Sequence, residues 1–444
     1  MRSLRSEEAS RSGTGLVSRT TRIDAPPRPR TALLAADSPR TVWDAPDEPL
    51  VVGSGAAATL SADGADRFAE IRAGAAELFA TGDVHAGAVV ARPRLFGGFS
   101  FHDDHDETSP WQGFPAAEFV LPRVQLTYGD EHAWLTVNAV NAAPDAVERR
   151  LLDVERSLAE SVDTPLSARP EVVGRERTTS ISAWRASVTA ATDRIAAGEL
   201  RKVVLAQALE LQLAAPLSIA DTLQRLDDTY PDCFRFLVEP TDGRAGFFGA
   251  TPERLVGLRG RTVETGALAG TTGRGETPAE DEWLAEELLA DPKNEHEHEL
   301  VVEAIREQLG PYAATIGTGD RGIRRLATVQ HIETPITAEL ADEEHVLDLV
   351  EALHPTPAVG GLPPDEALST IRETEPFERG WYAAPVGWFD AAGYGSFAVA
   401  LRSAIARDDT ATLFAGVGIV GDSDPDREWD EVQLKYRPIL DELE

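Results

Sequence analysis

The stretch FVLPRVQLTYGDEHAWLTVNAV, residues 119–140, decides the fold class. Two runs rich in aromatic, leucine and β-branched residues, 119–128 and 133–140, flank the turn-forming pair Gly129-Asp130. This is the pattern of a β-hairpin, whose two strands run antiparallel. The sequence therefore predicts an antiparallel sheet in the first half of the chain.

Outward from this hairpin, strands and helices follow one another without strict alternation. Further strands are predicted over residues 95–101, 203–213, 234–238, 247–250, 396–406 and 412–420, the third and fourth joined by the turn at 242–244. Apolar residues at three- and four-residue steps predict helices over 147–158, 181–198 and 280–309, the last interrupted near Asp291-Pro292. This order favours an α+β fold with largely antiparallel sheets over a parallel, doubly wound one.

Three portions are predicted along the chain. Residues 1–30 contain no apolar run long enough for a signal peptide or a membrane span and are expected to be a flexible lead-in. The polar segment 161–177, with two prolines, is the best candidate boundary. It separates an N-terminal α/β portion, 31–177, from a portion spanning 178–444.

The charge balance excludes several classes of partner. With 75 acidic and 42 basic residues among 444, the net charge is −33, which repels nucleic acid and anionic membrane surfaces. Only three of the basic residues are lysines, Lys202, Lys293 and Lys435, so 39 are arginines. The acidic excess favours a halophilic protein, although a GC-rich genome also replaces lysine by arginine.

The cysteine content indicates the compartment. The one cysteine, Cys233, has no intrachain partner for a disulfide and provides no thiolate cluster for zinc. A reducing cytoplasm is therefore the expected location.

Six segments place glycine beside ionisable residues in patterns that packing does not require. They are RKVVLAQ (201–207), GATPER (249–254), GALAGTT (266–272), KNEHEHE (293–299), HPTPAVGG (354–361) and residues 416–435. Together with ALRS (400–403), their order and spacing resemble the catalytic half of the chorismate-utilising enzymes, over about residues 180–444. Before residue 180 the resemblance is limited mainly to GGFSF (97–101). It implies the α+β fold of that family, with two largely antiparallel β-sheets packed together and helices on the outside.

Two residues carry the expected acid–base chemistry. Lys202 has the pattern of a sheet-edge surface lysine, yet it is retained in a chain that has replaced nearly every lysine by arginine, and arginine does not lose its proton near neutral pH. By resemblance, Lys202 is the general base that activates water, a lysine that the aminating relatives lack. Glu253 alone is typical of an ordinary surface glutamate, but its match to the family's TPE segment implies the general acid, which requires a raised pKa.

The metal assignment rests on resemblance as well. His296 and His298 are spaced i,i+2 and do not share a helical face, which argues against zinc. The family pattern implies that Glu297 and Glu431 bind Mg²⁺, which prefers a few carboxylate oxygens completed by water and substrate oxygens. The alternative for Glu431 is a surface ion pair with Lys435, spaced i,i+4.

Chorismate carries two carboxylates, so this acidic chain needs a local cationic pocket. The resemblance implies that Arg402 and the backbone around Gly416 hold the pyruvyl carboxylate, with support from Lys435. The other expected substrate-binding residues are Gly270 and Thr271 on the ring-carboxylate and Mg²⁺ side, His331 and Ala358. A structural role for His331 is nearly as well supported, and Lys293 is assigned only to bracing the helix with Glu297.

The resemblance implies an isochorismate synthase, an isomerase that acts on chorismate with Mg²⁺, as a monomer in menaquinone biosynthesis; a siderophore pathway stays open. Ala358, where aminating and salicylate-forming relatives commonly have threonine, favours simple hydroxyl transfer. Tyr382 and Leu401 do not decide between this activity and a further lyase step. The alternatives are a salicylate synthase, an aminating enzyme such as anthranilate synthase component I, and a non-catalytic dicarboxylate-binding protein.

Overall fold

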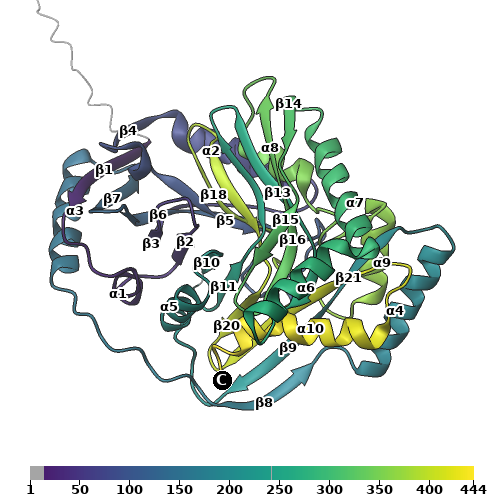
Figure 1. Ribbon diagram of the computed structural model, residues 1–444. Helices are drawn as coiled ribbons and strands as arrows, with labels where there is room; N and C mark the ends of the chain where they lie inside the picture. Colours follow the sequence, from purple (N-terminus) through teal and green to yellow (C-terminus); the bar gives the residue numbers. More distant parts are fainter. Residues whose placement is uncertain (1–14, 242) are drawn as a thin grey trace, which may run out of the picture.

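The structure is a computed structural model that describes residues 15–241 and 243–444 (Figure 1). It confirms the hairpin predicted over residues 119–140. Strands β6 (Ala117–Tyr128) and β7 (Ala133–Val140) pair antiparallel, with Val124 opposite Val137. The Gly129 amide donates to the His132 carbonyl at 2.9 Å and closes the turn.

Within the described residues the chain forms 21 strands, ten α-helices and one short 3₁₀ helix, Val89–Ala91. The other strands are β1 (Leu16–Ile23), β2 (Arg40–Asp44), β3 (Val51–Ala62), β4 (Gly82–His85), β5 (Arg94–Phe99), β8 (Val172–Arg177), β9 (Lys202–Leu213), β10 (Phe234–Val238), β11 (Gly246–Thr251), β12 (Arg254–Arg259), β13 (Thr262–Gly273), β14 (Ala313–Thr318), β15 (Gly322–Arg325), β16 (Val329–Leu340), β17 (Gly361–Leu362), β18 (Pro385–Asp390), β19 (Gly395–Val399), β20 (Ser403–Arg407) and β21 (Thr410–Ile419). The helices are α1 (Pro29–Leu34), α2 (Arg67–Ala80), α3 (Pro144–Ala159), α4 (Ile181–Ala196), α5 (Ile219–Thr229), α6 (Pro278–Ala290), α7 (Pro292–Leu309), α8 (Val346–Leu353), α9 (Pro364–Thr374) and α10 (Pro425–Leu440).

The strand ladders form two branches that diverge from the β3–β6 pair. One branch runs β6–β5–β18–β19–β12–β13–β16, and β14 and β15 both pair with β16. The other runs β3–β2–β10–β11–β20–β21–β9, and β8 and β17 both pair with β9. All of these ladders are antiparallel; the parallel ladder found among the described strands joins β1 to β4. The α+β, largely antiparallel prediction is therefore confirmed.

Two short connections carry the chain from one branch to the other. Pro252 and Glu253 link β11 to β12, and residues 400–402 link β19 to β20. The side chain of Thr251 donates to the Val399 carbonyl at 2.7 Å, so the two connections lie next to each other. This junction is where the candidate site forms.

Buried aromatic and aliphatic side chains fill the space around the branches. Phe119 of the hairpin packs against Phe389 and Phe397, with ring centroids 5.2 and 6.1 Å apart. Each such side chain contributes about 1.5–3 kcal/mol when it is fully buried. The helices lie on the outside of the strands, as Figure 1 shows for α4, α9 and α10.

The helices near the site begin at clear capping residues. The Ser180 hydroxyl accepts from the Ala183 amide at the start of α4, whose buried face includes Trp184 and Val188. Asp424 accepts from the first amides of α10, which satisfies donors that a helix start leaves unpaired. The Asp424 cap fixes the start of α10, the helix that carries two candidate site residues.

Several sequence expectations are wrong. Residues 16–23, assigned to a flexible lead-in, form β1, because the side chains of residues 16–19 are all buried and the backbone pairs with β7. Residues 1–14 of that lead-in lie outside the described part. Residues 172–177 of the predicted boundary are likewise a strand, β8, paired with β9.

The late strand predicted over 396–406 is two strands. Arg402 has φ of 47°, a left-handed conformation that is incompatible with a continuous strand, so the chain leaves β19 and enters β20 in the other branch. The predicted pair of sheets also differs in one respect from the structure: the ladders β2–β10 and β5–β18 join all the described strands into one hydrogen-bonded network. The helix 280–309 is interrupted as expected, between α6 and α7.

Within the described residues, no helix is both long enough and apolar enough to cross a membrane.

Candidate active site

A pocket with an empty volume of about 1020 Å³, including its mouth, lies at the junction of the two branches. Every lining residue falls between Lys202 and Lys435. The pocket brings together all eleven residues expected from the sequence: Lys202, Glu253, Gly270, Thr271, Glu297, His331, Ala358, Arg402, Gly416, Glu431 and Lys435.

Lys202 is the first residue of β9 and one of the largest fully buried side chains. Its Nζ lies 2.8 Å from Oε1 of Glu297 on α7, so the carboxylate fixes the direction of the lysine. A Cβ at Gly418 would lie 2.9 Å from both Lys202 Cε and Glu297 Oε1. Glycine at this position of β21 therefore leaves space for the pair.

Glu253 lies on the connection from β11 to β12 and is 6 % exposed. Its carboxylate accepts no hydrogen bond from the described residues, and burial raises its pKa from 4.5 to about 7, against the opposing effect of nearby cations such as Lys202 and Lys435. Desolvation disfavours the charged form of a carboxyl group. This glutamate therefore holds or releases a proton near neutral pH, as a general acid requires.

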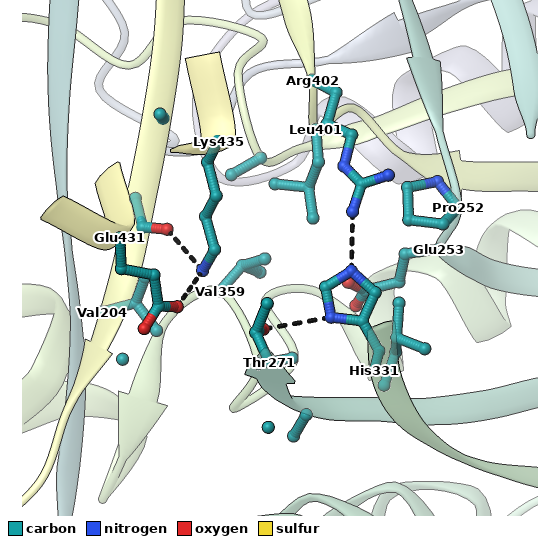
Figure 2. A pocket seen from close by; sticks show the side chains of 18 of the residues that line it. Val204, Pro252, Glu253, Thr271, His331, Val359, Leu401, Arg402, Glu431 and Lys435 are labelled. Carbon is teal, nitrogen blue, oxygen red and sulfur yellow. Dashed lines mark hydrogen bonds and ion pairs between the residues drawn. The ribbon is translucent and has the colours of Figure 1, made fainter. Parts of the chain in front are cut away.

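Arg402, on the other connection, is joined to two further pocket residues. Its Nη2 donates to Nε2 of His331 at 2.6 Å, and Nδ1 of His331 lies 3.0 Å from the Thr271 hydroxyl (Figure 2). Nη1 of Arg402 is buried and has no hydrogen-bond partner among the described residues. The pocket thus contains a guanidinium with a free donor.

A second cation lies on the opposite side of the view in Figure 2. Lys435 Nζ lies 2.8 Å from Glu431 Oε1, one helical turn earlier on α10, and donates to the Gly416 carbonyl at 3.0 Å. The ion pair that the sequence offered as an alternative is therefore present. It lies at the pocket wall, with Glu431 about one-third exposed.

Glycine shapes the floor of the pocket. Gly270 has φ of 80° and sits in a bulge, where the register of β13 against β16 shifts between Ala269 and Thr271. The left-handed conformation favours glycine, and a bulge turns backbone groups out of the ladder. This part of β13 is therefore free to face a ligand.

Ala358 lies on the loop between α8 and β17. Arg379 fixes this loop against β9, because Nη1 donates to the Val359 carbonyl at 2.9 Å and Nη2 donates to the Val204 carbonyl at 2.8 Å. Glu375 is paired with Arg379 and accepts from the Ala206 amide at 2.8 Å. The small side chain of Ala358 is thus held at the wall of the pocket that Lys202 also lines.

The family model described as chorismate binding enzyme matches residues 4–444. The chain belongs to this family. It is 37 % identical over 353 residues to the isochorismate synthase MenF of Bacillus subtilis, covering 79 % of this chain and 74 % of that protein. It is 39 % identical over 417 residues to the salicylate biosynthesis isochorismate synthase of Pseudomonas aeruginosa, covering 91 % and 85 %.

The fold of this chorismate-binding enzyme is also similar to solved structures. The structure of MenF, the menaquinone-specific isochorismate synthase from Escherichia coli, aligns with a TM-score of 0.83 at 27 % identity, covering 97 % of this chain and 95 % of the other. Anthranilate synthase component I from Streptococcus pneumoniae aligns with a TM-score of 0.73 over 99 % and 94 % of the two chains. At 20 % identity, this second likeness concerns the fold alone.

The residues present fit a magnesium ion that is completed by a ligand. Glu297 on α7 and Glu428 and Glu431 on α10 line the pocket and offer oxygen atoms. Within the described part of the chain, no three His, Cys, Asp or Glu side chains are grouped closely enough to hold an ion alone. Mg²⁺ commonly takes one or two carboxylates and fills its other positions with water and substrate oxygens.

Sequence reasoning missed several other lining residues, among them Asn294, Arg379, Phe414 and Glu428. Asn294 lies inside the KNEHEHE segment, and Glu428 precedes Glu431 by three residues on the same helical face, so both had a signal in the sequence. Arg379 had only the i,i+4 spacing to Glu375. The side chain of Lys293, which the sequence assigned to bracing α7, lies outside the described residues.

Proposed function

We propose that this protein is an isochorismate synthase that converts chorismate to isochorismate with Mg²⁺. The observation that carries the proposal is one pocket lined by a buried lysine, Lys202, and by a buried glutamate, Glu253, that retains a proton near neutral pH. A base and an acid are the two groups that exchange of a hydroxyl group requires. The names and the similarity of the relatives support the same reaction.

The two carboxylates of chorismate match the distribution of donors. Nη1 of Arg402 is buried and has no partner in the described part of the chain, and we assign Arg402, together with the backbone at Gly416, to the pyruvyl carboxylate. Gly270 and Thr271 line the side that we assign to the ring carboxylate. Lys435 adds positive charge within a chain of net charge −33, so the anionic substrate meets a local cationic pocket.

Proton transfers are balanced in the proposed mechanism. As the general base, Lys202 takes a proton from water as the water oxygen attacks C2 of the ring. Both ring double bonds shift, C1=C2 to C1=C6 and C5=C6 to C4=C5, and the C4 oxygen departs as water with the proton from Glu253. The charges left on Lys202 and Glu253 are neutralised by proton exchange with solvent before the next turnover.

Magnesium, when bound by Glu297 and Glu431, would neutralise and orient the ring carboxylate of the substrate. Glu297 also fixes the direction of Lys202 through the contact at 2.8 Å. The same carboxylate is thus shared between the metal site and the base.

Ala358 supports hydroxyl transfer over amination or pyruvate elimination, because a small apolar side chain at this wall offers no hydrogen bond to a second nucleophile or leaving group. For the pathway we infer menaquinone biosynthesis, supported by relatives named MenF in Bacillus subtilis, Pasteurella multocida and Escherichia coli. The Pseudomonas aeruginosa relative is named for salicylate biosynthesis, so salicylate is a product that the assay must resolve.

We further infer a monomeric, cytoplasmic and halophilic enzyme. The single cysteine, Cys233, is buried and free, which suits a reducing compartment. The excess of 75 acidic over 42 basic residues suits a salt-rich one.

The test is to incubate the purified chain with chorismate and Mg²⁺ in molar KCl, with and without ammonium, and to separate the products by chromatography. Isochorismate alone, lost on addition of EDTA, is the expected result. Salicylate with stoichiometric pyruvate would assign a lyase step, and an aminated product would overturn the role of Lys202. Glu253→Gln should lose turnover, whereas Glu176→Gln, at an exposed position of β8, should keep it.

A further inference from the structure

Three elements meet in one hydrogen-bonded chain across the pocket. Thr271 comes from β13, His331 from β16, and Arg402 from the connection between β19 and β20. Figure 2 shows the imidazole between the other two side chains, with one ring nitrogen directed to each. His331 is 7 % exposed and therefore has little access to solvent.

The chemistry of arginine fixes the tautomer of this histidine. A guanidinium has five donors and no acceptor, so Nε2 of His331 must accept from Arg402. The proton of a neutral ring then resides on Nδ1, which donates to the Thr271 hydroxyl. Burial and the charges of Arg402 and Lys435 hold the pKa of His331 well below its usual value, opposed by a backbone hydrogen bond to Gly270, so the ring stays neutral.

The orientation of the Arg402 guanidinium depends on a neighbouring hydrogen-bond acceptor such as His331. Among the described residues it makes no ion pair, its backbone is left-handed, and burial lowers its pKa. A carboxylate in place of His331 would orient the guanidinium but neutralise the charge. A neutral acceptor orients it and leaves the whole positive charge for a substrate.

We propose that His331 is a positioning residue, protonated at Nδ1, that directs Arg402 toward a substrate carboxylate and links it to Thr271 on the other carboxylate-binding side. This inference rests on the proposed function, in which Arg402 binds one carboxylate of chorismate. His331 transfers no proton in the reaction. It acts by holding a guanidinium in a binding geometry before the substrate arrives.

Two amide variants separate this role from general packing. In His331→Gln the amide oxygen reaches the position of Nε2 and still accepts from Arg402. In His331→Asn the shorter amide reaches only the position of Nδ1. Because a hydrogen bond to a charged group is lost, KM for chorismate should rise about tenfold or more in His331→Asn while kcat changes less, and His331→Gln should stay near the wild type.

Thr271→Val and Thr271→Ser form a second pair. Valine removes the hydroxyl that accepts from Nδ1–H and should raise KM. Serine retains the hydroxyl, so KM should stay near the wild-type value. His85→Asn, at an exposed position of β4, is the control for loss of a histidine. Equal rises of KM in His331→Asn and His331→Gln would overturn the positioning role.

A measurement on the wild-type protein separates this inference from the proposed function. In ¹⁵N-histidine-labelled protein, with the signal assigned by comparison with His331→Gln, we expect a neutral ring protonated at Nδ1 at pH 7. A proton on Nε2, or a charged ring, would overturn the inference whether or not the protein turns over chorismate. Absence of turnover in the wild type with the expected NMR signal would refute the proposed function alone.

Discussion

Replacing Glu253 by glutamine should stabilise the protein above pH 7 while greatly lowering turnover. Burial raises the pKa of this carboxyl from 4.5 to about 7. Below pH 4.5 the side chain is protonated in both the folded and the unfolded chain, so its burial does not lower the free energy of unfolding through ionisation. As the pH rises from 4.5 to about 7, the unfolded chain loses the proton first, and folding must retain a proton or bury a charge. At 1.36 kcal/mol for each pKa unit, the native state loses about 3 kcal/mol of stability across this interval.

Glutamine cannot ionise, so Glu253→Gln should be more stable than the wild type by about 3 kcal/mol at pH 8 and by almost nothing at pH 4.5. The assay is urea unfolding of both proteins at the two pH values in the same KCl concentration, with Glu176→Gln as the control for loss of one exposed carboxylate. An equal difference at both pH values, or a less stable variant at pH 8, would refute the argument that desolvation controls this pKa. Turnover of chorismate by the same variant should fall by about 10²–10⁴, the usual contribution of a general acid.

The other predictions concern the base, the anion site, the metal and the salt dependence. Lys202→Arg should lose about 10²–10⁴ in kcat despite keeping the charge, because arginine stays protonated; steady-state kinetics with near-normal kcat would contradict the assignment. Arg402→Met should raise KM for chorismate about 10- to 100-fold, from the loss of charged hydrogen bonds; an unchanged KM would place the carboxylate elsewhere. Glu297→Gln combined with Glu431→Gln should abolish Mg²⁺ binding in isothermal titration, and retained binding would exclude this site. With a net charge of −33, the free energy of unfolding should rise as KCl increases toward molar concentrations, and a flat or falling profile would contradict the halophilic inference.

The sequence predicts the elements whose pattern is local and strong. The hairpin of β6 and β7, the strand β9 and the helix α4 were all predicted from alternation or helical periodicity, and they lie within one or two residues of the expected bounds. No strand or helix was predicted within the first ninety residues. Strand β3 reads VVGSGAAATLSA, and its glycines and alanines have low strand propensity, so only pairing with β2 and β6 defines it.

The candidate site likewise has features that the sequence predicts and features that it does not. All eleven expected residues line one pocket, because ordered motifs report a spatial arrangement even where local propensity is weak. What the sequence could not predict is the partner of each side chain. The contact of Lys202 with Glu297, and of His331 with Arg402, joins residues 95 and 71 positions apart, and both depend on the connections between the branches. The left-handed backbone of Arg402 directs the chain from one branch of strands to the other, and no local sequence pattern predicts it.

The central claim is that a solvent water, activated at Lys202, supplies the new hydroxyl group. Conversion of chorismate in H₂¹⁸O, stopped early and analysed by mass spectrometry, tests it most directly. We expect isochorismate with one ¹⁸O at C2 and release of the original C4 oxygen to solvent. Isochorismate without label would show that the hydroxyl migrates within the substrate, and would contradict the roles given to Lys202 and Glu253.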